Sequence, residues 1–498
     1  MFDRDERRCL ARELALTLLV LSGFAGAASA AEATDSPLVE AAKNQDAKAV
    51  RSLLSQKADV NSRATDGSTA LLWLAHWNDL EMADLVLGAG ANPNTENDFR
   101  MTPLSQACTN GNADLVRLLL KSGANPNLAI ATGETPLMTC AKTGNADTVR
   151  WLIEYGAAIN ATEPAQNQTA LMWAAAERHP DVVGALIQAH SDLTPLTKQG
   201  FAAIHFAARV GDLDSVKLLL AAGVDVNLPT GAGASAGYTP LMVATLRAQI
   251  DVAQYLLDHG ADPNADGAGF TPLHWASTTW EGYAANPVYG FDDPMSGIPD
   301  RQAKLRLVNS LLAHGAKVNA RMTKRQPSFA TGYTDAVGAT PLLLAASVDD
   351  VEMMRILLQA GADPKIQTAT KATSIMAATG LNHGIGESLV IEAQAKDAVK
   401  LLLDLGVDPK GETTFGENAL FGPAYRGWNS LLAQLIDLGV NVNAVSKADT
   451  TPWRAANGQG DRLGGVLVNK EGADLLVKHG ADPNLGSPCE SQNRCREK

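Results

Sequence analysis

The chain is short of cysteine, of positive charge and of long apolar runs. It holds 5 cysteines in 498 residues, and its 41 lysines and arginines stand against 54 aspartates and glutamates, which gives a net charge of −13. A surface this acidic does not fit nucleic acid, whose phosphates require a basic surface. Beyond residue 30 no stretch is long and apolar enough to cross a membrane, so we expect no stable membrane insertion.

Catalytic motifs are missing as well. The sequence contains neither a phosphate-binding loop nor an H-E-x-x-H zinc motif. Gly233 to Gly237 fits the G-x-S-x-G pattern, but that nucleophile motif needs a strand before it and a helix after it, whereas this copy lies in a loop rich in glycine. The sequence therefore predicts a protein that is not an enzyme and that has no cofactor and no metal site.

The first 30 residues are typical of a secretory signal peptide. Four arginines between residues 4 and 12 precede an apolar run from Leu14 to Phe24, and small residues ending in Ala28-Ser29-Ala30 follow. We expect cleavage after Ala30. The mature protein is then periplasmic or secreted, by either the general or the twin-arginine export route.

A pattern of about 33 residues fills the rest of the chain. A fixed period of this length predicts a solenoid of stacked repeats, because no single repeat can bury its own apolar face. The first residue of each of the twelve copies, usually Thr, is Ser36, Thr69, Thr102, Thr135, Thr169, Ala202, Thr239, Thr271, Thr340, Thr373, Asn418 or Thr451.

Each copy predicts two helices and a hairpin. Thr caps the first helix and Pro occupies its first turn, where no hydrogen bond is lost. A Gly-Asn or Gly-Asp pair such as Gly111-Asn112 turns the chain into a second helix, which a glycine such as Gly123 ends. An Ala-Asx-x-Asn stretch then leads into an extended hairpin that reaches the next Thr.

This pattern resembles the ankyrin repeat. Thr271-Pro272-Leu273-His274-Trp275-Ala276 matches the signature T-P-L-H-x-A of that family, and Gly260-Ala261-Asp262-Pro263-Asn264 matches its turn. The resemblance covers about residues 36 to 484. It implies an all-α solenoid of about twelve helix-turn-helix repeats with β-hairpin loops, elongated and curved, similar to exported bacterial ankyrin proteins.

Departures from the period lie in the C-terminal half. Repeats eight, ten and twelve carry insertions between their helices, and Pro423 inside the first helix of repeat eleven predicts a kinked or short helix. The expected segments are a signal peptide (1–30), repeats one to seven with the start of repeat eight (31–274), an inserted loop (275–304), repeats eight to twelve (305–484) and a polar tail (485–498).

The resemblance implies a protein–protein interaction scaffold, because ankyrin proteins usually bind partners at hairpin tips and at the ends of the inner helices, on the concave face. Trp73, Trp173 and Trp275, inside the inner helices, are assigned to the core instead. The candidate contact residues are the tip aromatics Phe201, Tyr238 and Phe270, the helix-end residues His76, Trp77, Arg209 and Arg247, and the insertion residues Trp280 and Tyr283.

Two other functions remain open at this point. The insertions of repeats eight and ten could build a pocket for a ligand or a reaction, with Tyr283, His383 and Glu387 converging and Ser235 as a further catalytic candidate. The chain could also be a secreted effector that acts in another cell.

The cysteines give one disulfide candidate. Cys489 and Cys495 lie close together in the tail, where an oxidising compartment would favour a bond. Cys108 and Cys140 lie on the inner helices of adjacent repeats but are offset by one position, so we expect them not to pair and to act as small core residues.

Overall fold

The computed structural model describes residues 36–231, 236–278, 301–324, 337–381, 390–459 and 468–486. Across these ranges the chain forms twelve helix pairs and no strand, which confirms the all-α solenoid of twelve repeats. The chain divides into an N-terminal unit (residues 1–225 and 230–235) and a C-terminal unit (226–229 and 236–498). No helix within the described ranges has both the length and the apolar character needed to span a membrane.

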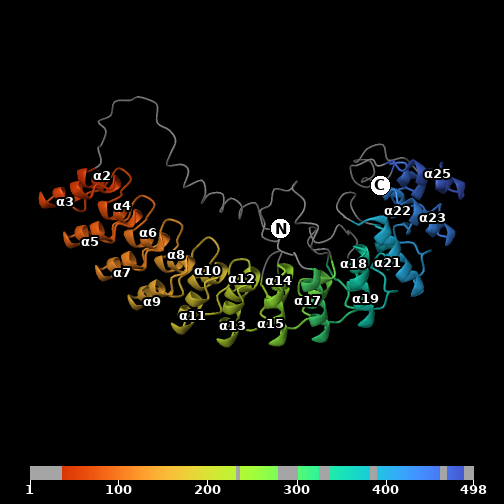
Figure 1. Cartoon of the computed structure of the whole chain (residues 1–498), viewed down its shortest axis with the longest axis horizontal. Coiled ribbons are helices and arrows are strands. Elements are labelled where there is room, and N and C mark those ends of the chain that lie inside the picture. Colours follow the sequence, from red (N-terminus) through yellow and green to blue (C-terminus); the bar gives the residue numbers. More distant parts are fainter. Residues whose placement is uncertain are drawn as a thin grey trace, which may run out of the picture. The chain divides into compact units, whose positions relative to one another are not determined.

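The N-terminal unit holds repeats one to six, whose inner and outer helices form two layers (Figure 1). The inner helices are α2 (Pro37–Lys43), α4 (Ala70–His76), α6 (Pro103–Thr109), α8 (Pro136–Thr143), α10 (Ala170–Ala176) and α12 (Ala203–Val210). The outer helices are α3 (Ala47–Ser55), α5 (Leu80–Gly88), α7 (Ala113–Lys121), α9 (Ala146–Glu154), α11 (Pro180–Gln188) and α13 (Leu213–Ala221).

The C-terminal unit holds repeats seven to twelve. Its inner helices are α14 (Pro240–Leu246), α16 (Pro272–Ala276), α18 (Pro341–Ser347), α20 (Ser374–Ala378), α22 (Phe421–Arg426) and α24 (Pro452–Ala456). Its outer helices are α15 (Ile250–Asp258), α17 (Arg301–Ala313), α19 (Val351–Gln359), α21 (Glu392–Asp404), α23 (Asn429–Asp437) and α25 (Lys470–Lys478).

Short polar side chains cap both helices of repeats two, three, four, nine and twelve, and one helix of several others. The Thr102 hydroxyl accepts a hydrogen bond from the Ser105 N–H at the start of α6, and the Asn112 side chain accepts one from Leu115 N–H at the start of α7. Each such cap stabilises a helix by about 1 kcal/mol. Helices of only seven to nine residues would be marginal alone, so caps and stacking together make them stable.

The expected β-hairpins are turns rather than strands. Only a few backbone hydrogen bonds close each turn, as from Asn97 N–H to Met101 O at 3.1 Å and from Arg100 N–H to Asn97 O at 2.8 Å. Each turn also bonds to the next one, for example from Ala131 N–H to Phe99 O at 3.0 Å. Within the described residues the only bridge assigned is the isolated one between Arg63 and Thr69.

In several repeats an asparagine shortly before the turn that joins two repeats links its repeat to the following one, and we name it the Asn clamp. Asn94 donates from Nδ2 to Gly123 O at 3.0 Å and accepts from Asn125 N–H at 2.7 Å. Lysine stands at this position in repeats nine and ten, as Lys365 and Lys410. The complete clamps are those of Asn61, Asn94, Asn127, Asn227, Asn264, Asn319 and Asn443.

The repeats with interhelix insertions have short inner helices. α16, α20 and α24 have five residues each, whereas the outer helices that follow the insertions of repeats eight and ten, α17 and α21, have 13. The prediction for Pro423 is confirmed, because α22 has only six residues. Gly422 lies so close to repeat ten that an added Cβ would be 1.9 Å from Thr379 O.

The prediction that Cys108 and Cys140 do not pair is wrong. They form a disulfide between α6 and α8, with Cα atoms 4.6 Å apart. Identical positions on stacked helices point in the same direction, so two side chains that meet across the gap must come from different positions. The offset therefore permits the bond. The other candidates, Cys489 and Cys495, lie outside the described residues.

Candidate functional site

One position of the inner helix differs between the two units. Counting the first residue of each repeat as one, the fifth residue is half-buried in repeats two to six and buried in repeats seven to twelve. The half-buried residues are Trp73, Gln106, Thr139, Trp173 and Phe206. The buried residues are Val243, Trp275, Leu344, Ala377, Gly422 and Ala455.

The assignment of all three tryptophans to the core therefore holds for Trp275, which is 4% exposed, and not for the other two. The indole Nε1 atoms of Trp73 and Trp173 are nevertheless buried and have no hydrogen-bond partner. Polar residues at the same position in neighbouring repeats, Gln106 and Thr139, were the signal in the sequence that this position faces outward in the N-terminal unit.

Four side chains of repeats one and two form the first cluster. The Trp73 and Trp77 rings are stacked with centroids 6.4 Å apart, and His76 packs edge-on against Trp77 at 4.6 Å. The Lys43 ammonium lies 5.6 Å from the centroid of the Trp73 ring, and Trp77 donates from Nε1 to Lys43 O at 3.1 Å. Trp77 remains 41% exposed, so the cluster offers an aromatic surface beside a cation.

Repeats four and five build a second cluster of the same kind. The Lys142 ammonium lies 4.9 Å from the Trp173 ring centroid. His179 Nε2–H donates to Lys142 O at 2.9 Å and thereby ties the end of α8 to the next repeat. Lys43, Trp73, His76, Trp77, Lys142 and Trp173 together are named the tryptophan–lysine surface; Gln106 and Thr139 occupy the same row between its two clusters.

The predicted row of tip aromatics is not an exposed surface. Phe201 is 9% exposed and packs against His205 and Phe206, and Phe270 is 2% exposed. Tyr238 is half-buried with its ring 6.2 Å from that of Phe270, and burial raises its pKa. Tip aromatics fill the space beneath the turns, which leaves Phe201 and Phe270 little area for a partner.

The remaining candidates are placed differently. Arg209 is exposed at the end of α12, and Arg247 is half-buried after α14. Several predicted residues lie outside the described residues, namely Trp280 and Tyr283 of the repeat-eight insertion, His383 and Glu387 of repeat ten, and Ser235.

Several charged residues of repeats eight, nine and eleven are partly or fully buried. Arg301 holds Asp350 through two hydrogen bonds of 2.6 and 3.1 Å, and the buried Lys304 ammonium donates to Thr278 O. Burial raises the pKa of Asp349 well above its ordinary value, against the attraction of Arg426. Perturbed carboxyl groups occur at functional sites, but Arg301 and Lys304 of repeat eight pair with Asp350 of repeat nine and so connect these two repeats.

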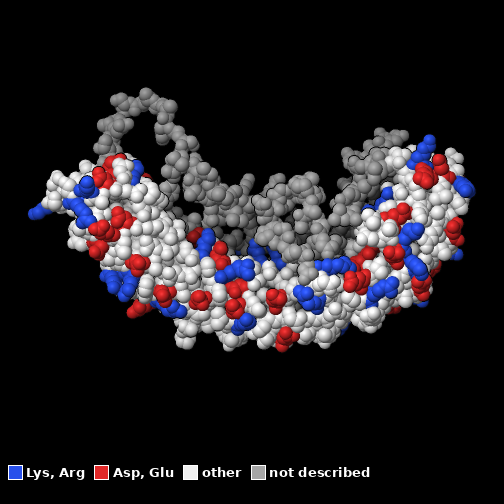
Figure 2. All heavy atoms as spheres, viewed as in Figure 1, with Lys and Arg blue, Asp and Glu red and all other residues white. Residues whose placement is uncertain are grey.

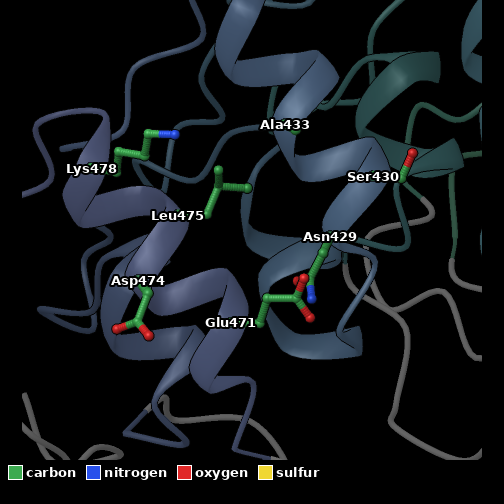
Figure 3. Close-up of a pocket in the computed structure, with 7 residues that line it drawn as sticks. All are labelled: Asn429, Ser430, Ala433, Glu471, Asp474, Leu475 and Lys478. Atoms are coloured by element: carbon green, nitrogen blue, oxygen red, sulfur yellow. The ribbon is translucent and has the colours of Figure 1, made fainter.

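A groove of about 530 Å³ lies between the outer helices α23 and α25. Figure 3 shows Asn429 and Glu471 at one end of this groove and Lys478 at the other. Its hydroxyl, Ser430 Oγ, accepts from Lys396 Nζ at 2.8 Å, and no histidine lines it. Among the residues that the structure describes, no three His, Cys, Asp or Glu side chains gather as metal ligands.

Comparison with known proteins decides the family. A family profile described as "Ankyrin repeats (3 copies)" matches overlapping segments between residues 12 and 284, and a second, "Ankyrin repeat", matches residues 337–369. Together they cover more than half of the chain. The chain is an ankyrin-repeat protein. The helix pairs and turns described above extend the repeats through the C-terminal unit to residue 486.

Several known proteins are similar to parts of this chain. Protein PhlB of Serratia liquefaciens is 36% identical over 124 residues, which are 24% of this chain and 53% of PhlB. Rabankyrin-5 of Homo sapiens is 27% identical over 183 residues, 34% of this chain and 16% of that protein. The E3 ubiquitin-protein ligase KEG of Arabidopsis thaliana is 26% identical over 297 residues, which are 56% of this chain and 17% of that protein. The matched segments thus span about half or less of these relatives.

Proposed function

We propose that this ankyrin-repeat protein is an exported, non-catalytic scaffold that binds a partner protein on the tryptophan–lysine surface. The observation that carries the proposal is the exposure difference at the fifth position, because among the described repeats this position leaves aromatic rings accessible only in the N-terminal unit. Aromatic side chains supply most of the binding energy in protein interfaces and are enriched there. Family membership supports an interaction scaffold in general, while the choice of surface rests on this chain.

Charge indicates the kind of partner. The inner helices α2 to α12 contain three cations, Lys43, Lys142 and Arg209, and one carboxylate, Glu40, although the whole chain carries a net charge of −13. On the face visible in Figure 2, lysines and arginines are interspersed with acidic residues rather than gathered in a continuous basic surface. This favours a protein partner with an acidic segment over nucleic acid, since complementary charge directs association.

Export is supported by two features. The first 30 residues have the order of a secretory signal peptide. The Cys108–Cys140 disulfide is typical of proteins in oxidising compartments. N-terminal sequencing of the protein from an envelope or culture fraction should begin at Ala31 or within a residue or two of it. Intact Met1 on soluble cytoplasmic protein would contradict export.

Capture experiments with matched variants test the binding surface. The mature chain is used to capture partners from an envelope extract, and affinity for the recovered partner is then measured. Trp77→Ala and Trp173→Ala should each weaken binding by about 2 kcal/mol or more, roughly 30-fold, if they are central contacts. Tyr155→Ala is the matched control, because Tyr155 is a 44% exposed aromatic at the end of the outer helix α9.

Charge reversal gives a second control. Lys43→Glu with Lys142→Glu should weaken binding and reduce its dependence on salt. Lys48→Glu with Lys121→Glu changes the net charge equally on exposed positions of the outer helices α3 and α7 and should leave affinity unchanged. Equal losses from both pairs would mean that net charge, and not this surface, determines binding.

A further inference from the structure

The Cys108–Cys140 disulfide is fully enclosed in the N-terminal unit. Cys108 is 0% exposed at the end of α6 and Cys140 is 1% exposed in α8, and the bond joins repeats three and four across 32 residues of sequence. Neither a reductant nor an oxidoreductase can reach sulfur atoms that are enclosed on all sides. The bond must therefore form before the two repeats close over it.

The position of the bond affects the spacing of the two clusters of the tryptophan–lysine surface. Repeat three lies between the two clusters of the tryptophan–lysine surface, which occupy repeats one and two and repeats four and five, and the bond joins it to repeat four. In a stack whose repeats contact only their neighbours, each interface must hold for the stack to act as one unit. A covalent link at this interface fixes the spacing of the two clusters.

We propose that Cys108 and Cys140 form a buried staple that is closed during folding in an oxidising compartment, and that the N-terminal unit reaches its full stability only once the staple is closed. The two thiols lose two protons and two electrons. The electron acceptor is the disulfide of a thiol–disulfide oxidoreductase, which becomes a dithiol through a mixed disulfide with one of the two cysteines. The location of this step rests on the proposed export, whereas the pairing and its effect on stability do not.

The burial of the bond favours a permanent staple over a reversible switch. A closed loop restricts the unfolded chain and so stabilises the folded one. Redox-sensing cysteines are accessible and have ionised thiols, and neither sulfur here is exposed. We therefore expect the bond to persist in reductant while the repeats remain folded.

Peptide mapping tests the pairing directly. Protein expressed with its leader is alkylated under denaturing conditions without reductant and digested with trypsin. Residues 101–117 and 122–142, which hold the two cysteines between tryptic sites, should appear as one linked pair. Alkylated cysteine in both peptides, or a link from either to Cys489 or Cys495, would overturn the proposal. Chain 31–498 made in a reducing cytoplasm should give alkylated peptides. A linked pair there would overturn only the claim that the bond needs export to an oxidising compartment.

Stability measurements test the staple. Cys108→Ala with Cys140→Ala should lower Tm by several degrees, and Cys489→Ala with Cys495→Ala is the matched control that should not. If the first variant fails to fold, wild-type protein refolded with and without reductant gives the same comparison. Native wild type in reductant should keep the linked peptides, and the denatured protein should lose them. Reduction at equal rates in both states, or an unchanged Tm without the bond, would contradict a buried staple.

Discussion

The two units contain the same repeat but use one position of its inner helix differently. In the N-terminal unit the fifth residue is half-buried and includes Trp73, Trp173 and Phe206; in the C-terminal unit it is buried in every repeat. Small residues explain part of this, because Gly422 permits contact with Thr379 O that no side chain would allow. An inner helix can thus present side chains to a partner or pack them against its neighbour.

The bonds that link neighbouring repeats also differ between the two units. Repeats one to three have complete Asn clamps, and a disulfide joins repeats three and four. In the C-terminal unit Lys365 and Lys410 replace the asparagine of two repeats, and three inner helices are cut to five residues. Buried charges such as Asp350 and Lys304 add a link between repeats eight and nine. Complete Asn clamps also occur in the C-terminal unit, at Asn264, Asn319 and Asn443, so the units differ in the added disulfide and buried charges and not in the use of the clamp.

Replacing buried tip aromatics should have the largest effect. Phe270→Ala and Phe201→Ala should each destabilise their unit by about 3–5 kcal/mol, because a buried ring is removed and a cavity remains. Phe99→Ala, at an exposed turn, should change the free energy of unfolding by less than about 0.5 kcal/mol. Denaturant unfolding followed by hydrogen exchange assigns each loss to a unit. Unchanged stability together with weaker partner binding would show instead that these tip aromatics contact the partner.

Acid should destabilise the C-terminal unit through His274. Burial lowers its pKa to about 4, and its Nε2–H donates to Ala320 O while Nδ1 accepts from Thr271 N–H. Above pH 6.5 the histidine is neutral whether folded or unfolded. Between pH 6.5 and about 4 only the unfolded chain binds the proton, so stability falls with falling pH, by up to about 3 kcal/mol.

The His274→Gln variant isolates this contribution. Asp349 acts in the opposite sense, because its raised pKa makes the folded state lose stability as pH rises. Asp349 is present in both wild type and variant, so its contribution cancels in the difference between their unfolding free energies. We expect the difference to shrink as pH falls from 6.5 towards 4. A difference that is constant across this range would mean that His274 does not resist protonation.

Exchanging residues of the Asn clamp should have the smallest effect. Asn94→Lys removes an acceptor and an amide donor from an exposed interface and should destabilise it by about 1 kcal/mol. Lys365→Asn or Lys410→Asn restores the clamp and should stabilise the C-terminal unit by a similar amount. Thermal unfolding of all three variants checks both signs together. Destabilisation by Lys365→Asn would show that the lysine has a role of its own.

The sequence predicts the frame of the molecule well because local chemistry determines it. Thr102 and Asn112 cap helices, Gly123 ends one, and the 33-residue period requires stacking, so helix pairs could be placed from residues alone. The direction in which each side chain points relative to the next helix could not be predicted in the same way. The Cys108–Cys140 bond and the half-burial of Trp73 and Trp173 depend on which way a side chain points relative to the next helix, which an apolar pattern does not contain.

Hydrogen exchange of the mature protein with and without its captured partner tests the binding surface most directly. We expect added protection in residues 70–77 and 170–177, which carry the two tryptophan clusters, and no change in the inner helices α14 to α24 of the C-terminal unit. The Tyr155→Ala variant, at the end of the outer helix α9, should give the same protection pattern as wild type. Protection confined to the C-terminal unit, with residues 70–77 and 170–177 unchanged, would contradict a binding surface in the N-terminal unit.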